Sequence, residues 1–203
     1  MARWEPDAFG RLRDAALALF VEQGFEKTTV AQITERAGLN RRTFFHHFSD
    51  KREVVFAGQD SADGLIADEI RAQPPSVDPL SAAVAGLQCA ADTSYEQYRE
   101  GAIALGRVIA ESPELREREL VKRAALAGTI AAALRERGTA EAAAVVAAWA
   151  AVAVFFVARN RWNQPGNERT LAGLMDEALD EFVSETRPSA VPAPRARPGR
   201  GSG

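Results

Sequence analysis

Cationic and aromatic side chains gather near the start of one short predicted helix. That helix begins after Asn40, and its outward-facing positions are Arg41, Arg42, Phe45 and His46. An arginine can bind guanine through two hydrogen bonds, and an apolar side chain can contact the methyl group of thymine. These residue types at the N-terminal end of a helix indicate an element that enters the major groove of DNA.

Two further polar side chains of this helix suit contacts with DNA phosphates. Thr43 and His47 lie between its outward and inward faces, where they can reach the backbone of a duplex. The adjacent pair His46 and His47 could also be read as metal ligands. Neighbours on a helix point about 100° apart, so one metal ion is poorly placed to bind both. Cys89 is distant in sequence, and we expect no metal site.

A second short helix must position the first, and its signals precede it in the chain. The hydroxyl of Thr29 can cap the start of this helix. Val30, Ile33 and Ala37 then recur at helical spacing and give it one apolar face. Gly38 ends it, because glycine tolerates the left-handed backbone conformation found beyond helix C-termini.

The outward-facing helix has its own cap and its own buried face. Asn40 is the expected cap, and Phe44 and Phe48 are four residues apart on one side. We expect these two rings to pack against the apolar face of the preceding helix. Asp50 is a third predicted cap, followed by the cationic Lys51. Two helices, a tight turn and this spacing predict a helix-turn-helix.

Residues 12–56 resemble the N-terminal domain of the TetR family of bacterial transcriptional regulators. The elements that carry the resemblance are Leu12, Leu19-Phe20, Gly24-Phe25, Thr28-Thr29-Val30, Ile33, Ala37-Gly38-Leu39 and Thr43-Phe44-Phe45-His46-His47-Phe48-Ser49-Asp50-Lys51. The resemblance implies an all-α fold, with an N-terminal three-helix helix-turn-helix domain and a C-terminal helical domain for ligand binding and dimerisation. It also implies a DNA-binding regulator, and we expect a repressor released by a small apolar or amphipathic molecule.

The resemblance assigns roles to particular positions. It implies that phosphates are held by Thr29, Thr43, His47 and Lys51, and that bases or the sugar-phosphate edge are met by Arg41, Arg42 and Phe45. The chain departs from the family at Phe44-Phe45, where a Leu-Tyr pair is usual. Phe45 has no hydroxyl, so a phosphate hydrogen bond from that position is absent here. The run from Arg41 to Phe45 also resembles a branch of regulators near mycofactocin genes that respond to acyl-CoA.

Charge is distributed unevenly along the 203-residue chain, whose formal net charge is −3. Residues 36–52 carry a net charge of +4, whereas residues 58–188 carry −7. The positive charge is therefore local to the predicted DNA-binding helices, and binding should weaken with added salt. The polar start predicts no secretory signal, and the single Cys89 fits a reducing compartment. We expect a cytoplasmic protein.

The chain divides into a DNA-binding domain over 1–56, a helical domain over 57–186 and a disordered tail over 187–203. Pro74-Pro75 forces a break between helices. The tail is rich in Pro, Ala, Arg and Gly. The helices expected outside the helix-turn-helix cover residues 7–23, 51–72, 78–100, 102–111, 113–137, 139–162 and 168–186.

One stretch of the helical domain is apolar enough to be considered for a membrane. Residues 142–158 contain no polar side chain, but 9 of these 17 residues are alanine. A membrane span needs about 20 strongly apolar residues, so we expect a helix buried in protein. The family resemblance implies a homodimer built on the last two helices. Its two-fold symmetry would match a pseudo-palindromic operator in double-stranded DNA.

Polar and aromatic residues scattered through the helical domain could line a site for the small-molecule effector. Tyr98 and Trp149 are the candidate ligand-lining residues, and we expect no cofactor. An enzyme is a second hypothesis, but the sequence shows no nucleophile elbow, phosphate-binding glycine loop or metal-ligand spacing. A third hypothesis is a helical interaction module that no longer binds DNA. The replacement of tyrosine by Phe45 favours this hypothesis.

Overall fold

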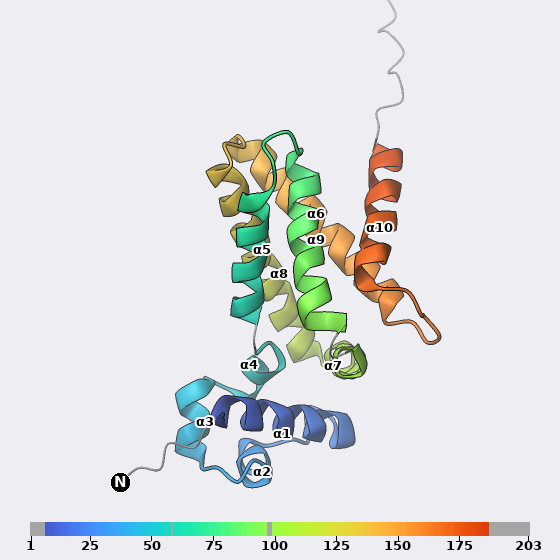
Figure 1. The fold of residues 1–203 in the computed structure, drawn as a ribbon. Helices are drawn as coiled ribbons and strands as arrows, with labels where there is room; N and C mark the ends of the chain where they lie inside the picture. The colour runs from blue at the N-terminus through green and yellow to red at the C-terminus, as the bar shows by residue number, and fades with distance from the viewer. Residues whose placement is uncertain (1–6, 58, 97–98, 187–203) are drawn as a thin grey trace, which may run out of the picture.

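The computed structural model describes residues 7–57, 59–96 and 99–186, and these ranges contain helices and no strand. The predicted all-α fold is confirmed. Figure 1 shows two parts, a small head formed by α1 to α4 and a larger body formed by α5 to α10. The helices are α1 Ala8–Gln23, α2 Val30–Arg36, α3 Arg41–His47, α4 Lys51–Val55, α5 Gln59–Ala72, α6 Pro79–Ala90, α7 Arg99–Glu111, α8 Pro113–Glu136, α9 Glu141–Trp162 and α10 Leu171–Thr186.

The head is a compact unit in which the predicted helix caps are present. Thr29, Asn40 and Asp50 each accept a backbone hydrogen bond at the start of α2, α3 and α4. Gly38 has a φ of +64° in the turn between α2 and α3, as its sequence position predicted. Four side chains from three helices fill the centre of the head and are at most 1% exposed: Leu12, Phe20, Ile33 and Phe44.

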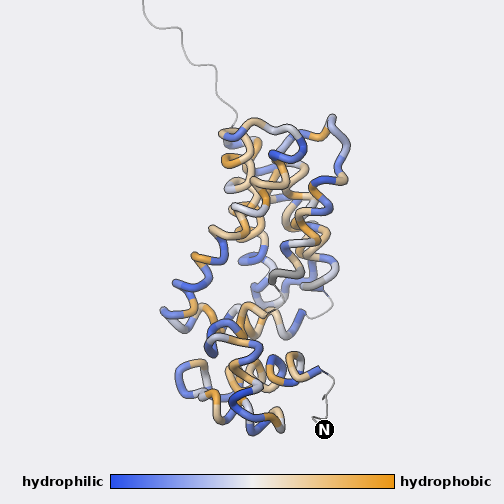
Figure 2. Tube along the Cα trace, turned by 90° about the vertical axis from the view of Figure 1, so that its left-hand side faces the viewer, coloured by the Kyte–Doolittle hydropathy of each residue, from blue (hydrophilic) through white to orange (hydrophobic). Residues whose placement is uncertain are grey.

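The body is built around α9, which packs against α6, α8 and α10. Its largest buried side chains come from α5, α6, α8, α9 and α10, and they include Ile70, Leu87, Leu134, Trp162 and Met175. Apolar segments line both the body and the head in the side view of Figure 2. Among the described residues, α9 is the one helix long and apolar enough to cross a membrane, and 44% of its apolar window is buried in the protein.

The core of the head extends into the body. Val108 and Ile109 of α7 and Leu115 of α8 belong to the same buried cluster as the centre of the head. Ser112 caps α8 and its hydroxyl also donates to the Glu26 carboxylate across 3.2 Å. The end of α7 and the start of α8 are therefore packed as part of the head. A movement of these two helices would act directly on the head.

The continuous helix predicted over residues 51–72 is wrong. α4 stops at Val55 and α5 begins at Gln59. The backbone N–H groups of Phe56 and Ala57 bond carbonyls three residues back, which tightens the last turn of α4. Phe56 also packs partly against the core of the head, so a tertiary contact ends the helix where local periodicity would continue it.

The helix predicted over residues 78–100 is also interrupted. α6 ends at Ala90 and a π-helical turn, η1, covers Ala91–Tyr95. The hydroxyl of Thr93 bonds back to the carbonyls of Cys89 and Ala90, an arrangement that bends helices. α7 begins at Arg99, earlier than predicted.

Glu96, just beyond η1, connects this turn to the end of α9 and the start of α10. Its carboxylate accepts from the indole N–H of Trp162 at 3.0 Å and from the backbone N–H of Leu171 at 2.6 Å. Residues that are distant in sequence thus hold the chain after α6 in place, and no local sequence pattern predicts these contacts.

The last two helices begin a little later than predicted. The N-cap position of α9 is Ala140 rather than Thr139, and no side chain caps it. α10 begins at Leu171, and the hydroxyl of Thr170 accepts from the backbone N–H of Gly173. The predicted disordered tail over 187–203 lies outside the described residues.

Candidate nucleic-acid interface

The face of α3 that was predicted to meet DNA is exposed. Arg41, Arg42, His46 and His47 are all exposed, and Phe45 leaves 52% of its surface to solvent. On the opposite side, Phe44 and Phe48 are 0% and 4% exposed, and their rings lie 5.5 Å apart. Burying two rings on one side fixes the rotation of this seven-residue helix, which is too short to be stable by itself.

The two arginines of α3 have their charges available. Neither Arg41 nor Arg42 forms an ion pair with any described residue, whereas Arg36 pairs with Glu22 at 2.5 Å. An unpaired guanidinium keeps all its donors for a ligand, and it loses no internal partner on binding. The start of α3 is therefore the part of the head best prepared to meet an anion or a base edge.

The two threonines predicted to hold phosphates already have partners inside the head. Thr29 forms a reciprocal capping box with Gln32, in which the backbone N–H of Gln32 donates to Thr29 Oγ1 across 3.3 Å. The Thr43 hydroxyl donates to Asn40 Oδ1 across 3.2 Å. The Thr29 hydroxyl also donates to Gln32 Oε1 across 3.1 Å. Each hydroxyl must therefore rotate away from its side-chain acceptor to donate to a phosphate. The exposed position of Thr29 permits this rotation.

Lys51 has partners inside the head, whereas its predicted role is to bind a DNA phosphate. Its ammonium group donates to the backbone carbonyls of Phe25 and Thr28 at 2.9 and 3.3 Å. The role in phosphate binding stays a prediction, and the structure adds a role in closing the loop between α1 and α2. The sequence carries no signal for this contact, because the partners are backbone atoms 23 and 26 residues away.

Phe9 is an aromatic neighbour of α3 that was not among the predicted site residues. Its ring stacks on Phe48 with centroids 5.1 Å apart and meets the edge of His47 at 6.0 Å. Phe9 is 36% exposed, so it extends the surface of the head beside the C-terminal end of α3. Its position three residues before the buried Leu12 is the one sequence signal that places it on the same side of α1.

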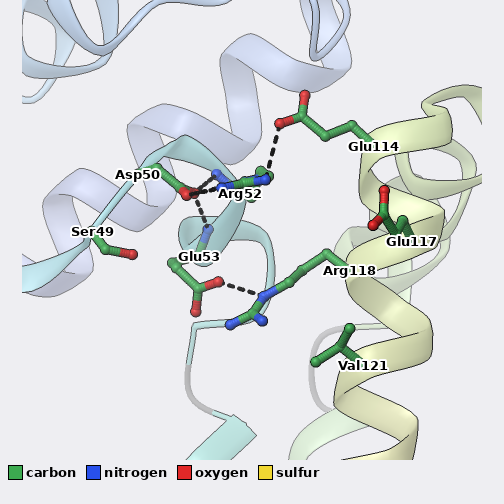
Figure 3. Close-up of a pocket in the computed structure, with 8 residues that line it drawn as sticks. All are labelled: Ser49, Asp50, Arg52, Glu53, Glu114, Glu117, Arg118 and Val121. Carbon is green, nitrogen blue, oxygen red and sulfur yellow. Dashed lines mark hydrogen bonds and ion pairs between the residues drawn. The ribbon is translucent and has the colours of Figure 1, made fainter.

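A charged cleft lies between α4 of the head and the first turns of α8 (Figure 3). It has a volume of about 310 Å³ and is lined by Ser49, Asp50, Arg52, Glu53, Glu114, Glu117, Arg118 and Val121. Across it, Glu53 of α4 pairs with Arg118 of α8 at 2.6 Å, and Arg52 approaches Glu114 at 3.3 Å. Small-molecule pockets are mostly apolar, so this cleft is better suited to joining α4 to α8 than to holding an apolar effector.

Asp50 lines this cleft and also caps the start of α4. Its carboxylate accepts from the side chain of Arg52 and from the backbone N–H groups of Arg52 and Glu53. The Arg52 guanidinium and these N–H groups together hold the pKa of Asp50 below its ordinary value. The carboxylate is thus charged at neutral pH, as a cap at the positive end of a helix should be.

Of the two candidate ligand-lining residues, the structure describes Trp149. Tyr98 lies outside the described residues. Trp149 is 49% exposed on the outer face of α9, beside Val146 at 70%, a position that does not fit a residue lining an interior site. The same face of α9 carries an apolar stripe with a spacing of three or four residues, composed of Ala142, Val146, Trp149, Ala153 and Val157.

Comparison with known proteins agrees with this geometry. Residues 12–57 match the family model described as bacterial regulatory proteins of the tetR family. The transcriptional regulator TcmR of Streptomyces glaucescens is 29% identical over 127 residues, which cover 60% of this chain and 56% of TcmR. The transcriptional repressor KstR2 of Mycobacterium tuberculosis is 41% identical over 46 residues, 23% of each protein. This chain therefore spans about half the length of TcmR and less of KstR2.

Solved structures share the fold over nearly the whole chain. FadR of Thermus thermophilus, a TetR-family repressor in complex with lauroyl-CoA, has a TM-score of 0.56 at 22% identity, covering 93% of this chain and all of FadR. SmeT, the repressor of an efflux pump of Stenotrophomonas maltophilia, has a TM-score of 0.51 at 20% identity, covering 96% and 97%. Residues 12–57 thus match the N-terminal domain of the tetR family of bacterial regulatory proteins, and the chain shares the fold of these solved structures. None of these matches bears on the resemblance to the mycofactocin-associated branch.

Proposed function

We propose that this protein is a sequence-specific DNA-binding transcriptional regulator that works in the cytoplasm. The observation that carries the proposal is the exposed start of α3, where Arg41 and Arg42 have no ion-pair partner among the described residues while Phe44 and Phe48 anchor the helix from behind. A helix held this way can enter the major groove with its cationic end toward the base edges. The family match over residues 12–57 supports the same reading.

We further propose that the active form is a homodimer that joins through α9 and α10. The exposed apolar stripe of α9 supports this, together with Phe182 and Val183 of α10, which are 36% and 38% exposed. Figure 1 shows α10 standing at one side of the body, where α9 and α10 of a second copy could complete a four-helix bundle. A two-fold dimer places its two α3 helices in successive major grooves when they are about 34 Å apart.

We propose that a small apolar or amphipathic molecule bound in the body releases the protein from its operator. Two contacts support a link between body and head: the α7 side chains buried in the head core, and the Glu53–Arg118 pair between α4 and α8. A ligand that favours one arrangement of α7 and α8 would shift the separation of the two heads. KstR2 is named a repressor, and FadR was solved with lauroyl-CoA, which supports ligand-controlled repression here.

The test is selection of the purified protein against a random DNA pool, followed by sequencing. We expect enrichment of an inverted repeat whose half-sites are one helical turn apart, about 10 base pairs. An Arg41→Ala/Arg42→Ala variant, run in parallel, should enrich nothing above the input pool. If the unmodified protein also enriches no sequence at low salt, even after refolding free of any bound ligand, the DNA-binding proposal fails. The hypothesis of a helical interaction module, which the replacement of tyrosine by Phe45 favours, then takes its place.

A further inference from the structure

Two arginines from different helices share one buried carboxylate inside the body. Glu119 of α8 is 8% exposed. One of its oxygens accepts from Arg123 of α8 at 2.6 Å, and the other accepts from Arg159 of α9. The Glu119 carboxylate thus pairs with both guanidinium groups. Partly buried charges are poorly screened by solvent, so these arginines interact strongly with charged groups near them.

The same two arginines are stacked on one aromatic ring. The guanidinium carbon of Arg123 lies 3.6 Å from the centroid of the Phe156 ring, and that of Arg159 lies 4.4 Å from it. The Nε atoms of both arginines are buried and lack a hydrogen-bond partner within the described parts of the chain. Buried N–H groups normally find an acceptor, so this cluster has two donors that its own side chains leave unused.

The wall next to the cluster is aromatic. The ring of Tyr95 in η1 meets Phe155 at 5.7 Å and Trp162 at 6.3 Å. Burial raises the pKa of the Tyr95 hydroxyl, whereas the nearby Arg159 lowers it and Glu119 and Asp63 act to raise it. The cluster therefore combines cationic donors with an apolar wall, the two kinds of contact that an amphipathic anion needs.

We propose that Arg123 and Arg159 bind the carboxylate or phosphate group of an amphipathic ligand whose apolar part packs against the aromatic wall. The inference rests on the proposed ligand-controlled function and adds that the ligand is negatively charged. An anion supplies acceptors for the unused N–H donors. Arginine is suited to both anions because its planar fork matches their paired oxygens.

The test uses calorimetric titration of the full chain with three ten-carbon probes: decanoate, decyl phosphate and the neutral 1-decanol. We expect at least one anion to bind at least about tenfold more tightly than decanol, the effect of one charge-assisted hydrogen bond. The preferred anion identifies whether a carboxylate or a phosphate is recognised. Equal binding of decanol and both anions overturns the proposal, and so does a failure of both anions to bind.

Four variants separate ligand binding from a structural role. Arg123→Gln should lower affinity for the preferred anion by at least about tenfold, and Arg123→Lys should restore part of it. Glu119→Gln removes the competing carboxylate and should raise anion affinity, a gain that a purely structural carboxylate cannot produce. Arg116→Gln removes an exposed charge from the same helix and should change nothing. Each variant is first checked for a cooperative thermal transition.

The outcomes also separate this inference from the proposed function. If the DNA selection succeeds but the anions bind no better than decanol, the anion site is wrong and the DNA-binding function stands. If Glu119→Gln weakens anion binding while remaining folded, Glu119 is part of the fold or of the ligand contact, and the proposed competition is overturned. If anions bind as expected and the selection fails, the anion site stands and DNA binding does not.

Discussion

The ammonium group of Lys51 lies 4.0 Å from the centroid of the Phe25 ring and donates a 2.9 Å hydrogen bond to the Phe25 carbonyl oxygen. This contact joins the first residue of α4 to the loop between α1 and α2. Phe25 is itself buried against Phe20 of α1. Lys51 therefore links three segments of the head, in a region where the family resemblance predicts contact with a DNA phosphate.

Replacing Lys51 with methionine should destabilise the protein by about 1–2 kcal/mol, since a hydrogen bond from a charged donor is lost while the apolar stem remains. We expect the salt dependence of DNA binding to stay unchanged if the ammonium group is fully used inside the head. Urea unfolding and binding titrations at several salt concentrations measure the two effects. Lys27→Met, at an exposed position, is the control. A fall of about 0.9 in the salt slope would instead support the phosphate contact.

Changing Arg42 to alanine should reduce affinity for the selected operator by about 1–3 kcal/mol and relax its preference at one base pair, because a bidentate contact with a base edge is lost. Affinity for random DNA should change less. Competition binding with both DNAs measures the ratio. Arg107→Ala, at an exposed site on α7, serves as the charge-matched control. Equal losses on the two DNAs would show that Arg42 holds a phosphate and reads no base.

Replacing Val146 with glutamate should convert the dimer into a folded monomer. Val146 is 70% exposed in the single chain, so the change costs the monomer little, but it places charge in the proposed interface. Sedimentation velocity should show half the mass, and affinity for a full operator should fall toward that for a half-site. Ala124→Glu adds the same charge at an exposed position of α8 and should stay dimeric. A dimeric Val146→Glu variant would place the subunit interface elsewhere.

Local sequence signals predicted the head well because its helices begin and end on local chemistry. Thr29, Asn40 and Asp50 cap helices whose first turns follow them directly. Gly38 ends α2 through its own backbone preference, and the pair Phe44 and Phe48 defines a buried face within a single helix. Features that depend on a few neighbouring residues can be predicted without knowing the rest of the fold.

The features that sequence reasoning missed depend on contacts between distant segments. The break after α4 follows from Phe56 packing into the head, and the chain beyond η1 is held by Glu96 bonding Trp162 and Leu171. The charged cluster on Phe156 joins residues up to 40 positions apart along the chain. Such pairs share no periodicity, so Glu119 looks like any surface glutamate until α8 and α9 are packed together.

The stability of the head should depend on pH through Asp50. Its folded pKa is depressed below the ordinary 3.8, chiefly by the Arg52 side chain. The charged carboxylate therefore contributes fully above pH 3.8, and its contribution is lost as pH falls through the lower folded pKa. Asp50→Asn keeps an oxygen for the cap but cannot titrate.

The wild type should exceed the Asn variant in stability by up to about 1 kcal/mol at pH 6, since the ion pair is partly exposed. The difference should shrink as the pH is lowered below 3.8. Urea midpoints of both proteins across this range measure it, and Asp14→Asn, at an exposed position outside any cap, corrects for the general loss of a negative charge. A difference that stays constant with pH would mean that the Asp50 carboxylate stabilises α4 through hydrogen bonds that the amide reproduces poorly, and that its charge contributes nothing.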